Sequence, residues 1–241
     1  MVEDKVTFAE KVLAFNRQLH LDAAVLPEGI GVMNPFRETN AALIDRVTRE
    51  FYGKFFSDHQ PRRVLLGINP GRLGAGITGV PFTDTKRLAS DCGITISDFS
   101  SHEPSSVFVY EVIRAFGGAA AFYNQFLISS LCPLGFVKLK PDGKAVNYNY
   151  YDQKDLEEAV TPFILQCLRQ HIALGIDTRR VFCLGTGKNF KFFQKLNKKY
   201  PLFGEIVPLE HPRFVVQYRS KRMPEFVDKY LRAFAEPLPT D

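Results

Sequence analysis

Long hydrophobic runs are missing from this chain, as are linkers and repeats. No stretch reaches the roughly 18 consecutive apolar residues of a membrane-spanning helix, and the N-terminal segment lacks the basic region and apolar stretch of a secretory signal. Segments rich in serine or glycine and internal repeats are absent too, while a hydrophobic content of 45% can fill a sizeable core. We therefore expect a cytoplasmic protein without membrane contact that folds as one domain over residues 1–241.

Cysteine is scarce. The chain has four cysteines, and no two of them form a C-x-x-C pair (Cys92, Cys132, Cys167 and Cys183). Three of them lie in apolar runs, which favours reduced thiols in the core. A metal or iron–sulfur ligand set assembled by folding is the less favoured alternative, and we expect no metal.

The net charge of +5 is concentrated in the last third of the chain. Residues 186–222 contain nine basic and two acidic side chains, so this stretch carries +7 and the rest carries −2. Such a field suits a polyanion such as DNA. A solvated helix face followed by a basic loop explains the pattern equally well, so charge alone does not decide the partner.

Short apolar strands alternate with helices along the sequence. The predicted strands are 63–68, 126–131, 179–185 and 205–209, and the predicted helices are 7–20, 38–56, 107–116, 156–171, 188–199 and 222–235. This alternation predicts an α/β fold, a three-layer α/β/α sandwich around a mainly parallel sheet of about four strands, with the N-terminal helices packed on the core. Pro162 interrupts one helical stripe, which predicts a kink or a restart with Thr161 as cap.

A glycine-rich loop follows the first predicted strand. Five glycines lie between positions 67 and 79, and the loop ends at Phe82. Asn69-Pro70-Gly71 is by composition a good turn, but a turn needs about four residues and this loop is far longer. Glycines at this density let backbone N–H groups approach a ligand closely.

The common nucleotide-cofactor motifs are absent. No G-x-x-x-x-G-K-[ST] sequence occurs, which argues against a Walker-type NTPase. Gly71, Gly74 and Gly76 reverse the spacing of the dinucleotide fingerprint, which argues against a Rossmann dehydrogenase. We expect no cofactor.

Two loop segments resemble a family of repair enzymes. Residues 67–71 (GINPG) with 78–82 (TGVPF) are similar to the first motif of the single-strand-selective monofunctional uracil-DNA glycosylases, and residues 211–213 (HPR) are similar to their second motif. Residues 132–134 (CPL) match a third landmark, so the resemblance covers residues 62–213. It implies a divergent subtype within the uracil-DNA glycosylase superfamily, with that superfamily's fold and a monofunctional DNA glycosylase activity in base excision repair.

Asn69 and His211 fit the chemistry of this reaction. Hydrolysis of an N-glycosidic bond passes through an oxocarbenium-like sugar while the base leaves as an anion, so it needs a positioned water and a donor aimed at the base. The Asn69 amide can hold the water and His211 can donate to the base oxygen, with a purely structural histidine before Pro212 as the alternative. Both follow parallel strands, so we predict that they meet at one edge of the sheet. No lysine stands in either motif, so lyase activity is not expected.

The resemblance also assigns base-binding residues. From the first motif these are Gly67, Ile68, Pro70, Gly71 and Phe82. Phe82 is the predicted stacking platform, with a plain core role as its alternative. The family carries an asparagine two residues before Cys132, where this chain has Ser130. A hydroxyl rotates and can donate or accept, whereas an amide presents fixed groups to uracil, so we predict a broadened or shifted substrate range that includes xanthine.

Two segments are predicted to bind DNA. Residues 213–222 mix apolar and basic side chains, which suits a loop that inserts Arg213 or Phe214 into the gap left by a flipped base. Residues 185–189 open a helix whose N–H groups can hold a phosphate, although an ordinary strand-to-helix turn explains them equally well. The predicted DNA-binding residues are Gly187, Lys188, Arg213, Phe214, Arg219 and Lys221. For the aromatic patch 148–151, a core role and a place in the DNA channel remain equally open.

We expect a monomer whose partner is DNA containing deaminated bases. Two alternatives from other classes remain, a nucleic-acid-binding module with little catalysis and a hydrolase of small nucleosides that uses the same pocket. Salt dependence separates the second from a DNA enzyme, because only binding to several phosphates weakens steeply with salt.

Overall fold

Four parallel strands form the central sheet of the computed structural model, which describes residues 6–38, 40–140 and 143–238. The strands are β2 (Arg62–Gly67), β3 (Phe126–Ser130), β6 (Ile176–Leu184) and β7 (Glu205–Leu209). Their order is β3-β2-β6-β7, and every neighbouring pair is parallel. All four predicted strands are confirmed, with ends that differ by a few residues.

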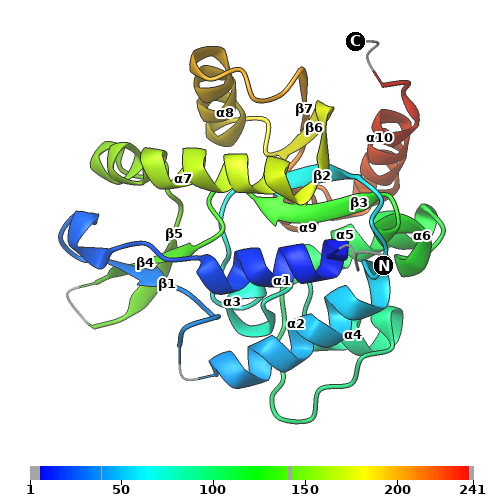
Figure 1. Cartoon of the computed structure of the whole chain (residues 1–241), viewed down its shortest axis with the longest axis horizontal. Coiled ribbons are helices and arrows are strands. Elements are labelled where there is room, and N and C mark those ends of the chain that lie inside the picture. The colour runs from blue at the N-terminus through cyan, green and yellow to red at the C-terminus, as the bar shows by residue number, and fades with distance from the viewer. Residues whose placement is uncertain (1–5, 39, 141–142, 239–241) are drawn as a thin grey trace, which may run out of the picture.

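Helices cover both faces of this sheet. The described helices are α1 (Phe8–Gln18), α2 (Ala41–Phe55), α3 (Ala75–Thr78), α4 (Thr85–Cys92), α5 (Pro104–Ala115), α6 (Ala119–Tyr123), α7 (Lys154–Leu174), α8 (Lys188–Lys199), α9 (Pro212–Tyr218) and α10 (Met223–Ala235), with short 3₁₀ turns η1 (Ala23–Val25) and η2 (Ser220–Arg222). In Figure 1, α1 and α7 lie in front of the sheet and α5 and α9 lie behind it. The connection from β2 to β3 and the connections onward to β6 and β7 run in opposite directions across the sheet, so right-handed crossovers place their helices on opposite faces. The predicted three-layer α/β/α architecture is therefore confirmed.

A second, antiparallel sheet was not predicted. It consists of β1 (Ile30–Met33), β4 (Gly135–Leu139) and β5 (Ala145–Tyr148), in the order β1-β4-β5. These strands have four or five residues and include half-buried and exposed positions, so they carry no continuous apolar run that sequence patterns detect. Their importance is positional, because β5 ends beside the loop that follows β2.

One local prediction was wrong, and one of two alternatives at another position is excluded. The segment 213–222, expected as a loop, is helical, with Pro212 at the first position of α9 and residues 220–222 in η2. Proline fits there because its missing N–H is not needed at a helix start. The α7 helix also does not restart at Pro162, since it runs without a break and the Thr161 hydroxyl donates to the carbonyl of Glu157 instead of capping a new helix.

The cysteines and the helices of the described residues can be compared with what the composition predicts. All four cysteines are free and buried, as predicted for core thiols. No helix in the described ranges is both long and apolar enough to cross a membrane.

One charged residue is built into the core where β2 begins. The Arg62 side chain is fully buried and donates to both carboxylate oxygens of Asp58 (2.9 and 2.7 Å) and to the carbonyls of Tyr123 and Gln60. Its guanidinium also lies over the rings of Phe8 and Phe56. A planar group with several fixed donors is needed to satisfy this set of acceptors.

Replacing Arg62 with Lys is expected to lower the free energy of unfolding by about 3 kcal/mol, because one ammonium cannot satisfy the carboxylate and both carbonyls in a buried site. Chemical denaturation measures the change. The exposed pair of Arg49 and Asp45 provides the control, since Arg49→Lys should change stability by less than about 0.5 kcal/mol. Equal effects of the two substitutions would contradict the assigned role of Arg62.

Candidate active site

Asn69 and His211 line one cleft at the carboxyl edge of the central sheet. The cleft has a volume of about 520 Å³, within the roughly 300–1,000 Å³ range of small-molecule sites. Asn69 follows β2 and His211 follows β7. Its other lining residues are Ile68, Pro70, Gly71, Arg72, Phe82, Glu103, Ser105, Val146, Asn147, Tyr148, Asn149 and Arg213. The fold thus brings together two side chains from distant parts of the sequence.

Backbone groups at the end of β5 and just after it hold the Asn69 side chain. Its Nδ2 donates to the carbonyl of Tyr148 (3.2 Å), and its Oδ1 accepts from the N–H of Tyr150 (3.1 Å). A carbonyl can only accept and an N–H can only donate, so these bonds fix which end of the amide is oxygen. The second N–H of Nδ2 donates to the carbonyl of Pro70 (3.4 Å), so Oδ1 keeps the one further hydrogen-bonding position, and Asn69 lines the cleft, where a water can be held.

Within the aromatic patch 148–151, Tyr150 supports the site from the protein core. Tyr150 is buried, and its hydroxyl donates to Oδ1 of Asn189 (2.8 Å) in the first turn of α8. Asn189 in turn donates to the carbonyl of Leu184 at the end of β6 (3.1 Å). Of the two roles left open by the sequence, Tyr150 has the core role, whereas Tyr148 lines the cleft.

His211 is a neutral donor by its surroundings. Its Nδ1 accepts the N–H of Arg213 (3.2 Å), so the proton of the neutral ring is on Nε2. Burial of the ring, with a smaller contribution from the charge of Arg213, lowers the pKa of His211 to about 4. Because the uncharged form dominates at neutral pH, the cleft contains an Nε2–H donor without a full positive charge.

Phe82 adopts a strained backbone conformation at the cleft. Its φ of 52° is the one positive value among the described residues other than glycine. The ring is mostly buried and contacts His211 edge to face at 5.6 Å. A Cβ at Gly67 would lie 3.0 Å from the Phe82 ring, so glycine permits this packing. Strain of this kind persists where surrounding contacts determine the conformation, often at functional sites.

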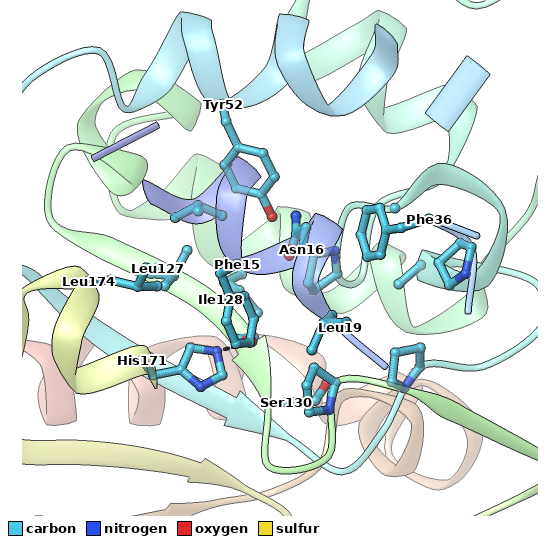
Figure 2. Close-up of a pocket in the computed structure, with 18 residues that line it drawn as sticks. Phe15, Asn16, Leu19, Phe36, Tyr52, Leu127, Ile128, Ser130, His171 and Leu174 are labelled. Atoms are coloured by element: carbon cyan, nitrogen blue, oxygen red, sulfur yellow. Dashed lines mark hydrogen bonds between the residues drawn. The ribbon is translucent and has the colours of Figure 1, made fainter. Parts of the chain in front are cut away.

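Ser130 does not line this cleft. It lines a separate cavity of about 30 Å³, with Ser129, His171, Asn16 and Tyr52 among its neighbours. Figure 2 shows Ser130 and His171 below this cavity and Tyr52 and Asn16 above it. The Ser129 hydroxyl is 2.8 Å from Nε2 of His171. A space of this size holds one or two waters and no nucleobase. Pro70 lines both cavities, and Gly67 lines neither.

A side pocket of about 220 Å³ adjoins the cleft and shares Ile68 and His211 with it. Gly187 and Lys188, which precede and begin α8, line this pocket together with Phe214. Arg219 and Lys221 are exposed at the end of α9 and on η2 and line neither cavity. The structure therefore groups the predicted DNA-binding residues into a set beside the cleft and a set farther along the surface.

Glu103 is a cleft residue that sequence reasoning missed. Its N–H donates to Asp84 Oδ2 (3.1 Å), and its Oε2 is buried without a hydrogen-bond partner in the described part of the chain. Burial, and secondly the charge of Asp84, raises the pKa of Glu103 to about 8, while Arg213 acts in the opposite direction. The residue lies in a segment without hydrophobic periodicity or motif, so no pattern marked it.

No group of three metal-ligating side chains of the His, Cys, Asp or Glu type occurs within residues 6–38, 40–140 and 143–238.

Replacing Glu103 with Gln is expected to raise Tm at pH 8 by about 3 °C or more and to change it little at pH 5. The pKa of the carboxyl is about 8 in the folded protein against an ordinary 4.5, so the folded state binds the proton more tightly and loses stability as pH rises from 4.5 through 8. The amide does not ionise and avoids this loss. Glu111→Gln, on the exposed side of α5, is the control for thermal unfolding. An equal rise at both pH values would contradict the assigned pKa.

The chain is similar to known proteins over most of its length. The family model described as Uracil DNA glycosylase superfamily matches residues 54–235. The crystal structure of wild-type Pedobacter heparinus SMUG2 is similar with a TM-score of 0.91 and 53% sequence identity, covering 95% of this chain and 97% of that chain. Comparison with curated protein sequences finds no match.

Proposed function

This chain belongs to the uracil-DNA glycosylase superfamily, and we propose that it is a monofunctional DNA glycosylase that hydrolyses the N-glycosidic bond of uracil and of other deaminated bases. The observation that carries the proposal is the shared cleft of Asn69 and His211, one a fixed amide and the other a neutral donor. The described residues that line the cleft include no lysine, which supports hydrolysis without Schiff-base lyase chemistry. We propose a monomer acting on chromosomal DNA.

Asn69 is proposed to position the attacking water. Its amide is held at both ends by backbone groups, so a water that donates to the remaining acceptor position of Oδ1 has a defined place. Placing a nucleophile in this way lowers the entropic part of the barrier. The oxygen of this water then faces the sugar as the sugar develops oxocarbenium character, as the reaction requires.

His211 is proposed to stabilise the departing base. As the glycosidic bond breaks, negative charge collects on the base oxygens, and an Nε2–H directed there strengthens its hydrogen bond in the transition state. The neutral ring supplies this donor throughout the physiological pH range, since its pKa is about 4. Phe82, which contacts His211 edge to face, is proposed to stack on the flipped base, and the backbone of residues 68–71 to contact it.

The DNA backbone is proposed to cross the cleft along α9 and the start of α8. Phe214 is exposed in the first turn of α9, three residues after His211. Arg213 is exposed as well, and the apolar ring of Phe214 favours it as the wedge. Gly187 and Lys188 at the 12-residue helix α8 are proposed to hold a phosphate, while Arg219 and Lys221 add longer-range attraction.

Asn69→Ala and His211→Ala are each expected to slow excision at least ~10²-fold, because each removes one positioned transition-state group. Single-turnover assays on oligonucleotides containing uracil, xanthine or hypoxanthine measure the rates. Binding to undamaged DNA should stay nearly unchanged in both variants.

The same assay distinguishes the alternatives. A nucleic-acid-binding module would bind DNA without excision by the wild type, and a nucleoside hydrolase would act on free nucleosides with little dependence on salt. A DNA glycosylase that contacts several phosphates should instead lose affinity steeply between 50 and 200 mM salt. Excision that survives both alanine substitutions would refute the assignment of Asn69 and His211.

Ser130 is proposed to broaden the substrate range. It does not line the cleft, but it is the strand partner of Gly67 in the first motif, and Pro70 lines both its small cavity and the cleft. Ser130→Asn is expected to raise the ratio of uracil to xanthine excision ~10-fold, because a fixed amide matches uracil better than a rotating hydroxyl. Ser97→Asn, at an exposed position, is the control. An unchanged ratio would exclude Ser130 as the reader.

A further inference from the structure

Attack of water on the sugar releases one proton, which needs an acceptor other than Asn69 and His211. Asn69 binds water through an amide, which does not take up a proton near neutral pH. His211 has its proton on Nε2 and its Nδ1 lone pair bonded to the N–H of Arg213. Neither proposed catalytic side chain can therefore receive the proton that the water releases.

Glu103 is the one carboxyl group among the described residues that line the cleft. The other titratable groups there are His211, Tyr148 and the cations of Arg72 and Arg213, and an arginine side chain only donates. Oε2 of Glu103 is buried and has no hydrogen-bond partner in the part of the chain that the structure describes. Oε1 is not one of these buried unpartnered atoms, and it has no hydrogen bond to a described residue. One carboxyl oxygen is therefore held in the wall of the cleft while the other is available.

The position of Glu103 is firmly determined. Its backbone is bonded to the buried carboxylate of Asp84, which also accepts from the Ser106 hydroxyl (2.9 Å) in α5. Its carboxyl group packs against Gly74, where a Cβ would lie 1.8 Å from Oε2. A side chain larger than hydrogen at position 74 would displace the carboxyl group, so the loop after β2 and the start of α5 together hold it.

We propose that Glu103 is the general base of the reaction, a role that rests on the proposed glycosylase function. The water oxygen forms a bond to C1′ of the sugar while one of its O–H bonds breaks, and that proton moves to Oε1 of the ionised Glu103. The glycosidic bond breaks with its electron pair remaining on the base. The proton later leaves to the base anion or to solvent, which restores the carboxylate.

The charges around Glu103 suit a base that works near neutral pH. Asp84 faces it from the start of α4, Arg213 from α9, and Arg72 and His211 from the cleft, while His102 is exposed and 3.7 Å from Asp84. The raised pKa of about 8 makes the carboxylate a stronger proton acceptor than an ordinary glutamate. The ionised form, which the step requires, is populated as pH rises toward and above 8.

The test is the pH dependence of excision from a uracil-containing oligonucleotide between pH 6 and 9. In the wild type, kcat/KM from single-turnover experiments should rise with pH and level off above about 8, since this parameter reports groups of the free enzyme. Glu103→Gln should lower the rate ~10²-fold at pH 9 and much less at pH 6, where the wild-type carboxyl is already protonated. Glu103→Asp keeps a carboxyl and should keep the rise with pH, at a lower plateau.

Glu111→Gln is the matched control on the same helix, outside the cleft, and should leave the whole profile unchanged. Thermal unfolding of each variant verifies that it is folded. A ratio of wild-type to Glu103→Gln rates that is equal at every pH, or a wild-type rate that falls through pH 8, would overturn the general-base role alone. A wild type that excises no base at any pH would overturn the proposed function as well.

Discussion

The two long-range backbone hydrogen bonds to the Asn69 side chain are the constraint on which the rest of the site depends. They come from residues 148 and 150, so they exist only if β5 ends in the correct register beside the loop after β2. The small antiparallel sheet sets that register by pairing β5 with β4 and β4 with β1. Tyr150 extends the support to Asn189 and the start of α8. One network therefore joins the proposed water position to the proposed phosphate-binding loop.

Burial holds two titratable side chains of the cleft largely uncharged at neutral pH. Desolvation opposes the charged form of both His211 and Glu103, lowering the pKa of the first and raising that of the second. A neutral donor can strengthen its bond to a base as negative charge develops, and a carboxyl with a raised pKa can exchange a proton near neutral pH. The positive φ of Phe82 and the buried acid both reduce stability, which is common where a site is shaped for function.

Parallel strands explain how much of the fold and of the site could be predicted from the sequence. Runs such as residues 64–67 (VLLG) are continuously apolar because both faces of the strand are buried, and this pattern is visible without coordinates. The carboxyl ends of such strands share one edge, so residues that follow β2 and β7 were expected to lie together. The strands β1, β4 and β5 have no such pattern because one side of each is partly exposed, and they were missed.

By itself, the sequence determined the α/β/α layers and the residues that end at the sheet edge, because burial and chain direction follow from local patterns of apolar residues and glycines. Only the tertiary structure decided what surrounds those residues. The bonds to Asn69 come from positions 79 and 81 residues away, and the environment of Glu103 combines Asp84, Gly74 and Arg213 from separate segments. Ser130 faces a small cavity and not the cleft, since the side on which a side chain lies depends on its packing in the sheet. Hydrogen-bond partners and pKa values depend on distances between remote parts of the chain, which local sequence does not encode.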